Sequence, residues 1–204
     1  MNIRFLERRW RALLAGAVLG TMAFAAQAAA KNTTAGKAVF TLTSPDVAEG
    51  KTIAEAQVFN SFGCHGRNIS PALSWSHVPA GTKSFALLVH DPDAPTGGAG
   101  WWHWLVYNIP AETARLAKGA GRADGSTLPR GAASAVTDYG KPGYGGPCPP
   151  EGDKPHRYVF TVYALKVPKL DVPADARASL VGFMVNANAI GKATVTGMYG
   201  RGKG

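Results

Sequence analysis

Short apolar runs, rather than long helical stripes, dominate the pattern of hydrophobic and polar positions along the chain. In these runs apolar residues either alternate with small polar residues or form brief continuous stretches, and both patterns are typical of strands. The predicted strands cover residues 38–43, 84–90, 102–109, 157–165 and 193–199. Residues 60–75 and 111–147 are rich in glycine and proline and predict irregular structure.

One segment, residues 174–190, carries helical spacing and predicts a helix that Gly191 would cap at its C-terminus. The apolar residues that recur at this spacing are Leu180, Met184, Ala187 and Ile190. Because 25 glycines and 14 prolines accompany short, separated strands, we expect a mostly β fold, a β-sandwich or a related sheet, and not a βαβ array. No internal repeat or linker interrupts residues 38–204, which predicts a single domain there.

The first 28 residues have the composition of a targeting segment. Four arginines, at positions 4, 8, 9 and 11, precede an apolar stretch at 12–26, and the small residues Ala26 and Ala28 fit the pattern that a signal peptidase cleaves. We expect cleavage after Ala28, with Ala30 as the second choice, and a loose mature terminus at 29–37. A transmembrane anchor is the alternative, but a span needs about 20 apolar residues, so no stable membrane insertion is expected. The protein is then periplasmic or secreted, by the Sec or the twin-arginine route.

Charge argues against one class of partner. Cleavage would leave 204 − 28 = 176 residues and would lower the formal net charge of +9 to about +6. The remaining lysines and arginines are scattered singly, which does not favour nucleic-acid binding. A basic surface can attract small anions or anionic partners, and it can equally serve solubility alone.

The chain has two cysteines, Cys64 and Cys148. An exported protein meets an oxidising compartment, where an even number of cysteines favours a disulfide. Two buried free thiols are the alternative, because sequence alone does not place the two Cα atoms within reach of each other.

Two segments carry candidate chemistry, and each joins a proline-bearing loop to a strand that holds a histidine. The first has Asp-Pro-Asp-Ala-Pro at 91–95, followed by His103 between two tryptophans. The second has Gly-Tyr-Gly-Gly-Pro-Cys-Pro-Pro at 143–150, followed by His156. Such a glycine loop can direct a few backbone N–H groups at an anion, although Gly/Pro clusters are also ordinary turns.

The histidines favour a binding site. A polar ring in the apolar strand around His103 needs a partner, and the period of two places Trp101 and Leu105 on its face. By the same period His156 shares a face with Tyr158, and an imidazole and a phenol can both donate to an oxyanion.

The aspartate at the start of the first segment adds a charge. Asp91 can accept from an imidazole and favour its charged form, whereas Asp93 can simply cap its turn. Each of these residues alone is more often structural than functional.

Together these motifs resemble the signatures of the phosphatidylethanolamine-binding protein family, and most closely its bacterial branch, called Raf-kinase-inhibitor-like. The resemblance covers residues 38–199. It rests on the Asp-Pro-Asp-Ala-Pro segment, the Trp-x-His pair, the Gly-x-x-Pro-Pro loop, the His-Arg-Tyr strand, and Asn68, Ser70, Pro71, Leu73 and Trp75 in the N-terminal half. Several separated motifs in one order are stronger evidence than one short pattern.

The resemblance implies a large antiparallel sheet packed with a smaller one, peripheral helices, and a pocket for phosphate, phosphoethanolamine or related anions. The pocket would be formed by Asp91, Trp101, His103, the backbone of Gly146 and Cys148, His156 and Tyr158. Eukaryotic members bind protein partners, including kinases. Here the loop at 96–100 is short and the chain is expected to be exported, so a cytosolic kinase is not the expected target.

We therefore expect a binding module for a small phosphorylated or carboxylated ligand, without cofactor or metal, and leave a protein partner and a homodimer open. The alternative is a hydrolase in the same pocket, for which Cys148 is the candidate nucleophile, and a disulfide would disable it. Binding would require the two histidines on one face of neighbouring strands. It should weaken as pH rises past about 6.5, the ordinary pKa of histidine.

Overall fold

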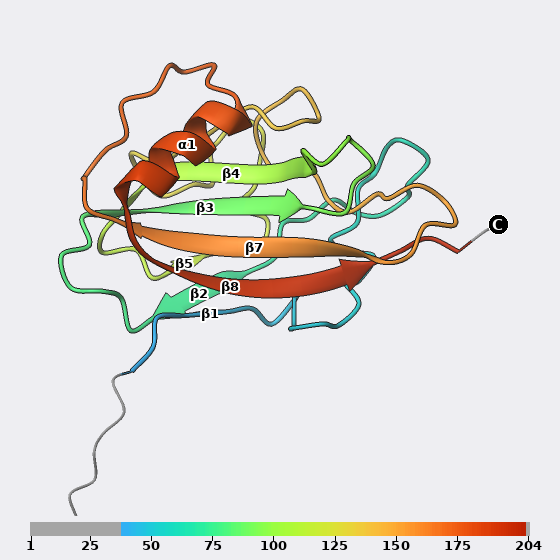
Figure 1. The fold of residues 1–204 in the computed structure, drawn as a ribbon, viewed down its shortest axis with the longest axis horizontal. Helices are drawn as coiled ribbons and strands as arrows, with labels where there is room; N and C mark the ends of the chain where they lie inside the picture. The colour runs from blue at the N-terminus through green and yellow to red at the C-terminus, as the bar shows by residue number, and fades with distance from the viewer. Residues whose placement is uncertain (1–37, 203–204) are drawn as a thin grey trace, which may run out of the picture. The chain divides into compact units, whose positions relative to one another are not determined.

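The computed structural model describes residues 38–202, so the predicted targeting segment and the loose terminus at 29–37 lie outside the described residues. In the described part the chain is mostly β, as predicted, and Figure 1 shows its strands and single labelled helix. The elements are β1 (Thr41–Thr43), β2 (Leu73–Ser76), β3 (Ser84–Asp91), β4 (Trp101–Pro110), β5 (Arg115–Leu116), β6 (Ala133–Ser134), β7 (His156–Leu165), α1 (Ala178–Asn188) and β8 (Ala189–Tyr199). No helix among these residues is long and apolar enough to cross a bilayer.

The strands form two antiparallel sheets, in agreement with the predicted architecture. The smaller has the order β1-β2-β5 and the larger the order β6-β4-β3-β7-β8. In the large sheet β3 is central, and it pairs with β4 on one side and with β7 on the other. Figure 1 shows α1 beside β4, and β1 beside β8, where contacts join them.

Two hydrophobic clusters cover the two faces of the large sheet. One cluster joins residues of the small sheet, such as Leu73 and Trp75, to Phe85 and Phe160 on the large sheet. The other joins Leu88 and Leu105 with the buried face of α1. Since alternate residues of β3 enter opposite clusters, a strand buried on both faces reads as a continuous apolar run.

The helix is shorter than predicted and buries a different face. It begins at Ala178, and the residues that it buries are Ala178, Val181, Gly182 and Val185. Leu180 is 40% exposed and Phe183 is 70% exposed. Ile190, predicted as the last apolar residue of the helix, lies in β8 instead. Because apolar residues occur all around this helix, its spacing alone did not identify the buried face.

Gly191 does not cap the helix. The C-cap is Ala189, whose extended backbone leads directly into β8. Gly191 lies within β8, where a Cβ would come within 2.6 Å of Pro79. The glycine is therefore explained by a close approach of two segments. Three short strands, β2, β5 and β6, lie where irregular structure was predicted, and β2 offers only two buried apolar residues, Leu73 and Trp75.

Candidate functional site

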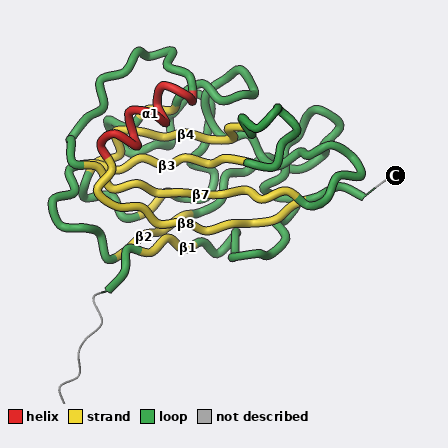
Figure 2. The backbone as a smooth tube through the Cα atoms, in the orientation of Figure 1, coloured by secondary structure: helices red, strands yellow, loops and turns green. Residues whose placement is uncertain are grey.

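A cavity of about 220 Å³ lies where β3 ends and where β4 and β7 begin. Figure 2 shows that loops surround this end of the large sheet. Six of the seven predicted site residues line it, namely Asp91, Trp101, His103, Cys148, His156 and Tyr158. The lining residues that sequence reasoning did not assign are Phe62, Ala94, Pro95, Thr96, Tyr139, Pro149 and Pro150.

Asp91 is the hub of the cavity wall. Its Oδ1 accepts the backbone N–H groups of Asp93 and Ala94 at 2.8 and 3.1 Å, which forms the tight turn after β3. Its Oδ2 lies 2.8 Å from Nδ1 of His156. Asp91 is 3% exposed, and a buried carboxylate needs such partners. Most of its hydrogen-bonding capacity is thus used to hold the wall in place.

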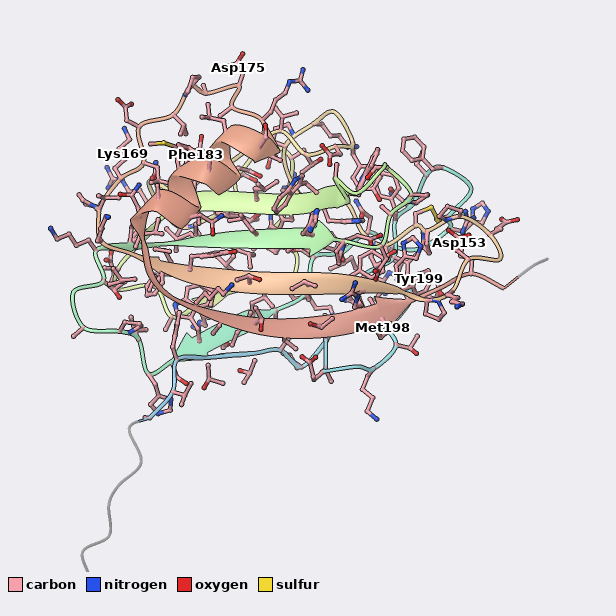
Figure 3. All side chains as sticks on the ribbon, viewed as in Figure 1. Asp153, Lys169, Asp175, Phe183, Met198 and Tyr199 are labelled. Atoms are coloured by element: carbon pink, nitrogen blue, oxygen red, sulfur yellow. A yellow bond between two sulfur atoms is a disulfide. The ribbon has the colours of Figure 1, made fainter. Side chains whose placement is uncertain are left out.

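His156 lies between two carboxylates. Its Nδ1 donates to Asp91, and its Nε2 is 3.4 Å from Oδ2 of Asp153. Figure 3 shows Asp153 on the same side of the fold as Tyr199, away from Phe183 of α1. The predicted contact between Asp91 and an imidazole therefore exists, and the imidazole is that of His156.

A second acidic residue ties the turn to β7. The backbone N–H of Arg157 donates to Asp93 Oδ2 at 2.8 Å, and its guanidinium donates to both oxygens of the same carboxylate. These hydrogen bonds lower the pKa of Asp93 to about 2. Asp93 therefore braces the 91–95 turn against β7 and does not cap it, because Asp91 does so.

His103 faces the cavity because β4 contains a bulge. Val89 pairs with Trp104 and His90 pairs with Trp102, so His103 is an extra residue opposite this step. Trp104 then belongs to the cluster on the cavity face, and Leu105 packs on the helix face. The prediction that Leu105 shares the face of His103 is therefore wrong, since a bulge shifts the alternation by one residue.

The ring of His103 is fixed and uncharged. Its Nδ1 is 2.7 Å from the carbonyl oxygen of Gly145, which can only accept, so Nδ1 carries the proton. The ring is 3% exposed, and burial lowers its pKa to about 4. Its Nε2 is buried and has no hydrogen-bond partner among the described residues.

Two hydrogen-bond donors of the cavity wall are also without partners among the described residues. They are the hydroxyl of Tyr158 and Nε1 of Trp101. Tyr158 is 1% exposed, and burial raises its pKa, so the hydroxyl keeps its proton. The rings of His103 and Tyr158 meet edge to face with centroids 5.1 Å apart. Buried polar groups normally have partners, and three orphan groups around one cavity indicate a place for a polar ligand.

The backbone N–H groups of the glycine loop at 143–150 are not all directed at the cavity, contrary to the prediction. The amide of Gly146 donates to Oδ1 of Asn68 at 2.7 Å, so it does not face the cavity. The carbonyl of Gly146 accepts the hydroxyl of Tyr139 at 2.9 Å. A Cβ on Gly146 would clash with the backbone of Gln57. The glycine thus permits a close backbone approach, and of the two predicted rim residues only Cys148 lines the cavity.

The two cysteines form a disulfide, as predicted from their number and from the expected export. It joins the loop of Phe62, which is exposed at the mouth of the cavity, to the loop of Cys148 and Pro149. Arg201 adds a second link, because its guanidinium donates to the carbonyls of Pro149 and Gly63 at 2.7 and 3.1 Å. Both links fix the position of the cavity mouth.

The two histidine-bearing strands are not neighbours, contrary to the expectation. β3 lies between β4 and β7 and ends at Asp91, so side chains from both outer strands meet above its end. Tyr139, which stacks on Phe59 at 4.1 Å and meets Trp101 and His103 edge to face, comes from a loop with no recognisable pattern. No local signal in the sequence could have found it.

The described part of the chain brings neither basic side chains nor a set of metal ligands to the cavity. None of the cavity-lining residues described is a lysine or an arginine. No group of three or more His, Cys, Asp or Glu side chains within residues 38–202 is arranged to hold a metal ion. The wall thus combines one carboxylate, two imidazoles, aromatic groups and prolines.

This fold is that of a family of binding proteins. The family model described as phosphatidylethanolamine-binding protein matches residues 43–200, and the chain belongs to that family. The UPF0098 protein YbcL of Escherichia coli (strain K12) is 49% identical over 189 residues, which are 93% of this chain and 98% of that protein. The crystal structure of E. coli YbcL, titled a new member of the mammalian PEBP family, has a TM-score of 0.78 and 52% identity over 80% of this chain and 99% of that one. A protein of Mycobacterium tuberculosis (strain H37Rv) named as a candidate lipoprotein, LppC, is 39% identical over 160 residues, which are 78% of this chain and 71% of that protein.

Proposed function

We propose that this protein is an exported binding module whose cavity takes the head group of a small phosphorylated or carboxylated ligand. The observation that carries this proposal is the pair of buried, unpartnered donors, Tyr158 Oη and Trp101 Nε1, in one cavity wall. Leaving a buried donor unpaired costs about 1–3 kcal/mol, and anionic ligand oxygens that accept from these donors would remove that cost. Family membership supports a binding role, and a partner protein that senses the loaded cavity fits the same role.

Removal of the Tyr158 hydroxyl tests this proposal. In Tyr158→Phe we expect the affinity for phosphate or phosphoethanolamine to fall about 10- to 100-fold, because a hydrogen bond to a charged group contributes about 1.5–3 kcal/mol. The unfolding midpoint should stay the same or rise, since the hydroxyl is buried without a partner in the described chain. Calorimetric titration and thermal unfolding measure the two effects.

Tyr163→Phe is the matched control. Tyr163 lies on the same strand, β7, but packs with the cluster on the helix face. Its variant should bind as the parent protein does. Equal affinities of Tyr158→Phe and the parent protein would contradict the assignment of the cavity, and absence of binding by the parent protein would contradict the proposed function itself.

We propose binding rather than catalysis. Cys148, the candidate nucleophile, is joined to Cys64, and a disulfide sulfur offers no thiolate. The carboxylate of Asp91 is occupied by two backbone N–H groups and by His156. The purified protein can be screened for phosphatase and esterase activity and analysed for bound metal. Turnover that depends on His156 would support the hydrolase alternative instead of this proposal.

Export is part of the proposal, and two observations support it. The chain carries a disulfide, which persists in oxidising compartments, and the relative LppC is named as a candidate lipoprotein. We expect protein isolated from the periplasm or the medium to begin at Ala29, after removal of residues 1–28. Intact-mass measurement of the isolated protein is the check, and an uncleaved chain retained in the cytosol would contradict the prediction.

A further inference from the structure

The cavity offers its ligand one acceptor among its donors. The carbonyl of Gly145 has no proton to give, so the 2.7 Å contact places the ring proton of His103 on Nδ1. The other nitrogen, Nε2, then presents a lone pair. This atom is buried and has no hydrogen-bond partner in the described chain. A ligand that satisfies Nε2 must therefore bring a hydrogen of its own.

The surroundings keep Nε2 an acceptor at neutral pH. The titratable groups on the cavity side of His103 are Asp91 at the end of β3, Tyr158 and His156 from β7, and Tyr139 from its loop, and His90 of β3 acts on it from a distance. Burial dominates and holds the pKa of His103 near 4, although the charge of Asp91 acts in the opposite direction. Asp91 is also committed to His156 and to two backbone N–H groups.

The charge of the cavity disfavours a doubly charged ligand. No lysine or arginine occurs among the described lining residues, and the carboxylate of Asp91 belongs to the wall. The second imidazole of the wall, His156, already lies between the carboxylates of Asp91 and Asp153. A second negative charge on the ligand would therefore meet like charge without compensation.

Resting on the proposed function, we propose that the cavity selects a phosphate monoester in its singly protonated form, with the P–OH group donating to Nε2 of His103. The remaining phosphate oxygens accept from Tyr158 and Trp101. A fully ionised monoester lacks the hydrogen that Nε2 needs, and so does a phosphodiester. His103 is then the residue that discriminates between the singly protonated and the fully ionised ligand.

Two small probes with the same charge test this selection. Methyl phosphate below its second pKa of about 6 is a monoanion with one P–OH group, and dimethyl phosphate is a monoanion with none. At pH about 5 we expect methyl phosphate to bind at least about tenfold more tightly, the effect of one hydrogen bond. Between pH about 5 and about 8 its affinity should fall about 100-fold, following the monoanion fraction of the ligand.

Inorganic sulfate shows whether the proton of the complex belongs to the ligand or to the protein, because sulfate carries no proton between pH about 5 and about 8. Calorimetry in buffers of different ionisation enthalpy counts the protons taken up on binding. We expect methyl phosphate to bind with proton uptake above pH about 6 and sulfate to bind weakly without it. Sulfate binding accompanied by uptake of one proton would mean that an imidazole of the cavity wall, His103 or His156, becomes charged in the complex. The protein and not the ligand would then carry the proton, and the proposal would be overturned.

Two variants test the acceptor itself. His103→Gln places an amide oxygen near Nε2 and should retain the preference for methyl phosphate over dimethyl phosphate. His103→Leu removes the acceptor and should abolish that preference. Unfolding is measured at both pH values, because a folded-state pKa below the ordinary 6.5 makes the fold less stable as pH falls toward about 4. The parent protein alone decides the proposal if a variant does not fold.

The monoester can come from a soluble metabolite or from a lipid such as phosphatidic acid. Co-sedimentation with phosphatidylcholine vesicles that contain phosphatidic acid, compared with vesicles that lack it, distinguishes the two sources. Stronger vesicle binding at pH about 5 than at about 8 would assign the lipid, and no vesicle binding would assign a soluble monoester. Equal affinity for methyl and dimethyl phosphate would overturn the selection and leave the proposed function standing. Binding of neither probe nor sulfate would overturn both.

Discussion

Asp91→Ala should lower the free energy of unfolding by about 3 kcal/mol and abolish ligand binding. The carboxylate accepts two backbone N–H groups of the 91–95 turn and the Nδ1–H of a buried imidazole. Its loss leaves three donors without that acceptor, at a position that is 3% exposed. Chemical denaturation measures the loss of stability, and titration with phosphate measures binding.

Two control variants separate the causes. Asp91→Asn keeps an oxygen for the turn but removes the charge beside His156, so we expect a smaller loss of about 1–2 kcal/mol. Asp93→Ala removes an ion pair with Arg157, which is partly exposed to solvent, and such pairs contribute about 1 kcal/mol or less. A loss for Asp91→Ala no larger than that for Asp93→Ala would contradict the role of Asp91 as the hub of the wall.

Reduction of the disulfide should lower the free energy of unfolding by at least as much. Cys64 and Cys148 are 84 residues apart in the sequence, and in the chain-entropy model a loop of this length stabilises the fold by about 4 kcal/mol. Denaturation of the parent protein with and without reductant measures this difference. The double variant Cys64→Ala/Cys148→Ala should match the reduced parent protein and should not respond to reductant.

Ligand affinity should also fall on reduction, since the disulfide joins two loops that form the cavity mouth. Arg201 would still connect the carbonyls of Gly63 and Pro149. We therefore expect the mouth to loosen without opening fully, with an affinity loss of about tenfold, or 1.4 kcal/mol. A reduced protein as stable as the oxidised one would show that other contacts already hold these loops.

The main strands were predictable because their signal is local. Short apolar runs bounded by prolines and glycines identified β3, β4 and β7 to within one residue at each end. The ordered motifs indicated the family and placed six of the seven proposed site residues around the cavity. The number of cysteines, taken with the expected export, indicated the disulfide.

What the sequence by itself determined is therefore the main strands β3, β4 and β7, the family, and which residues carry polar chemistry. The tertiary structure alone decided how they meet. In the tertiary structure β3 lies between the two strands that carry the histidines, and a bulge in β4 directs His103 to the cavity. The amide of Gly146 donates to Asn68 and not to the cavity. The tertiary structure also selects which face of α1 is buried. The physical reason is that strand order, bulges and hydrogen-bond partners depend on contacts between residues far apart in the chain, and no local spacing encodes them.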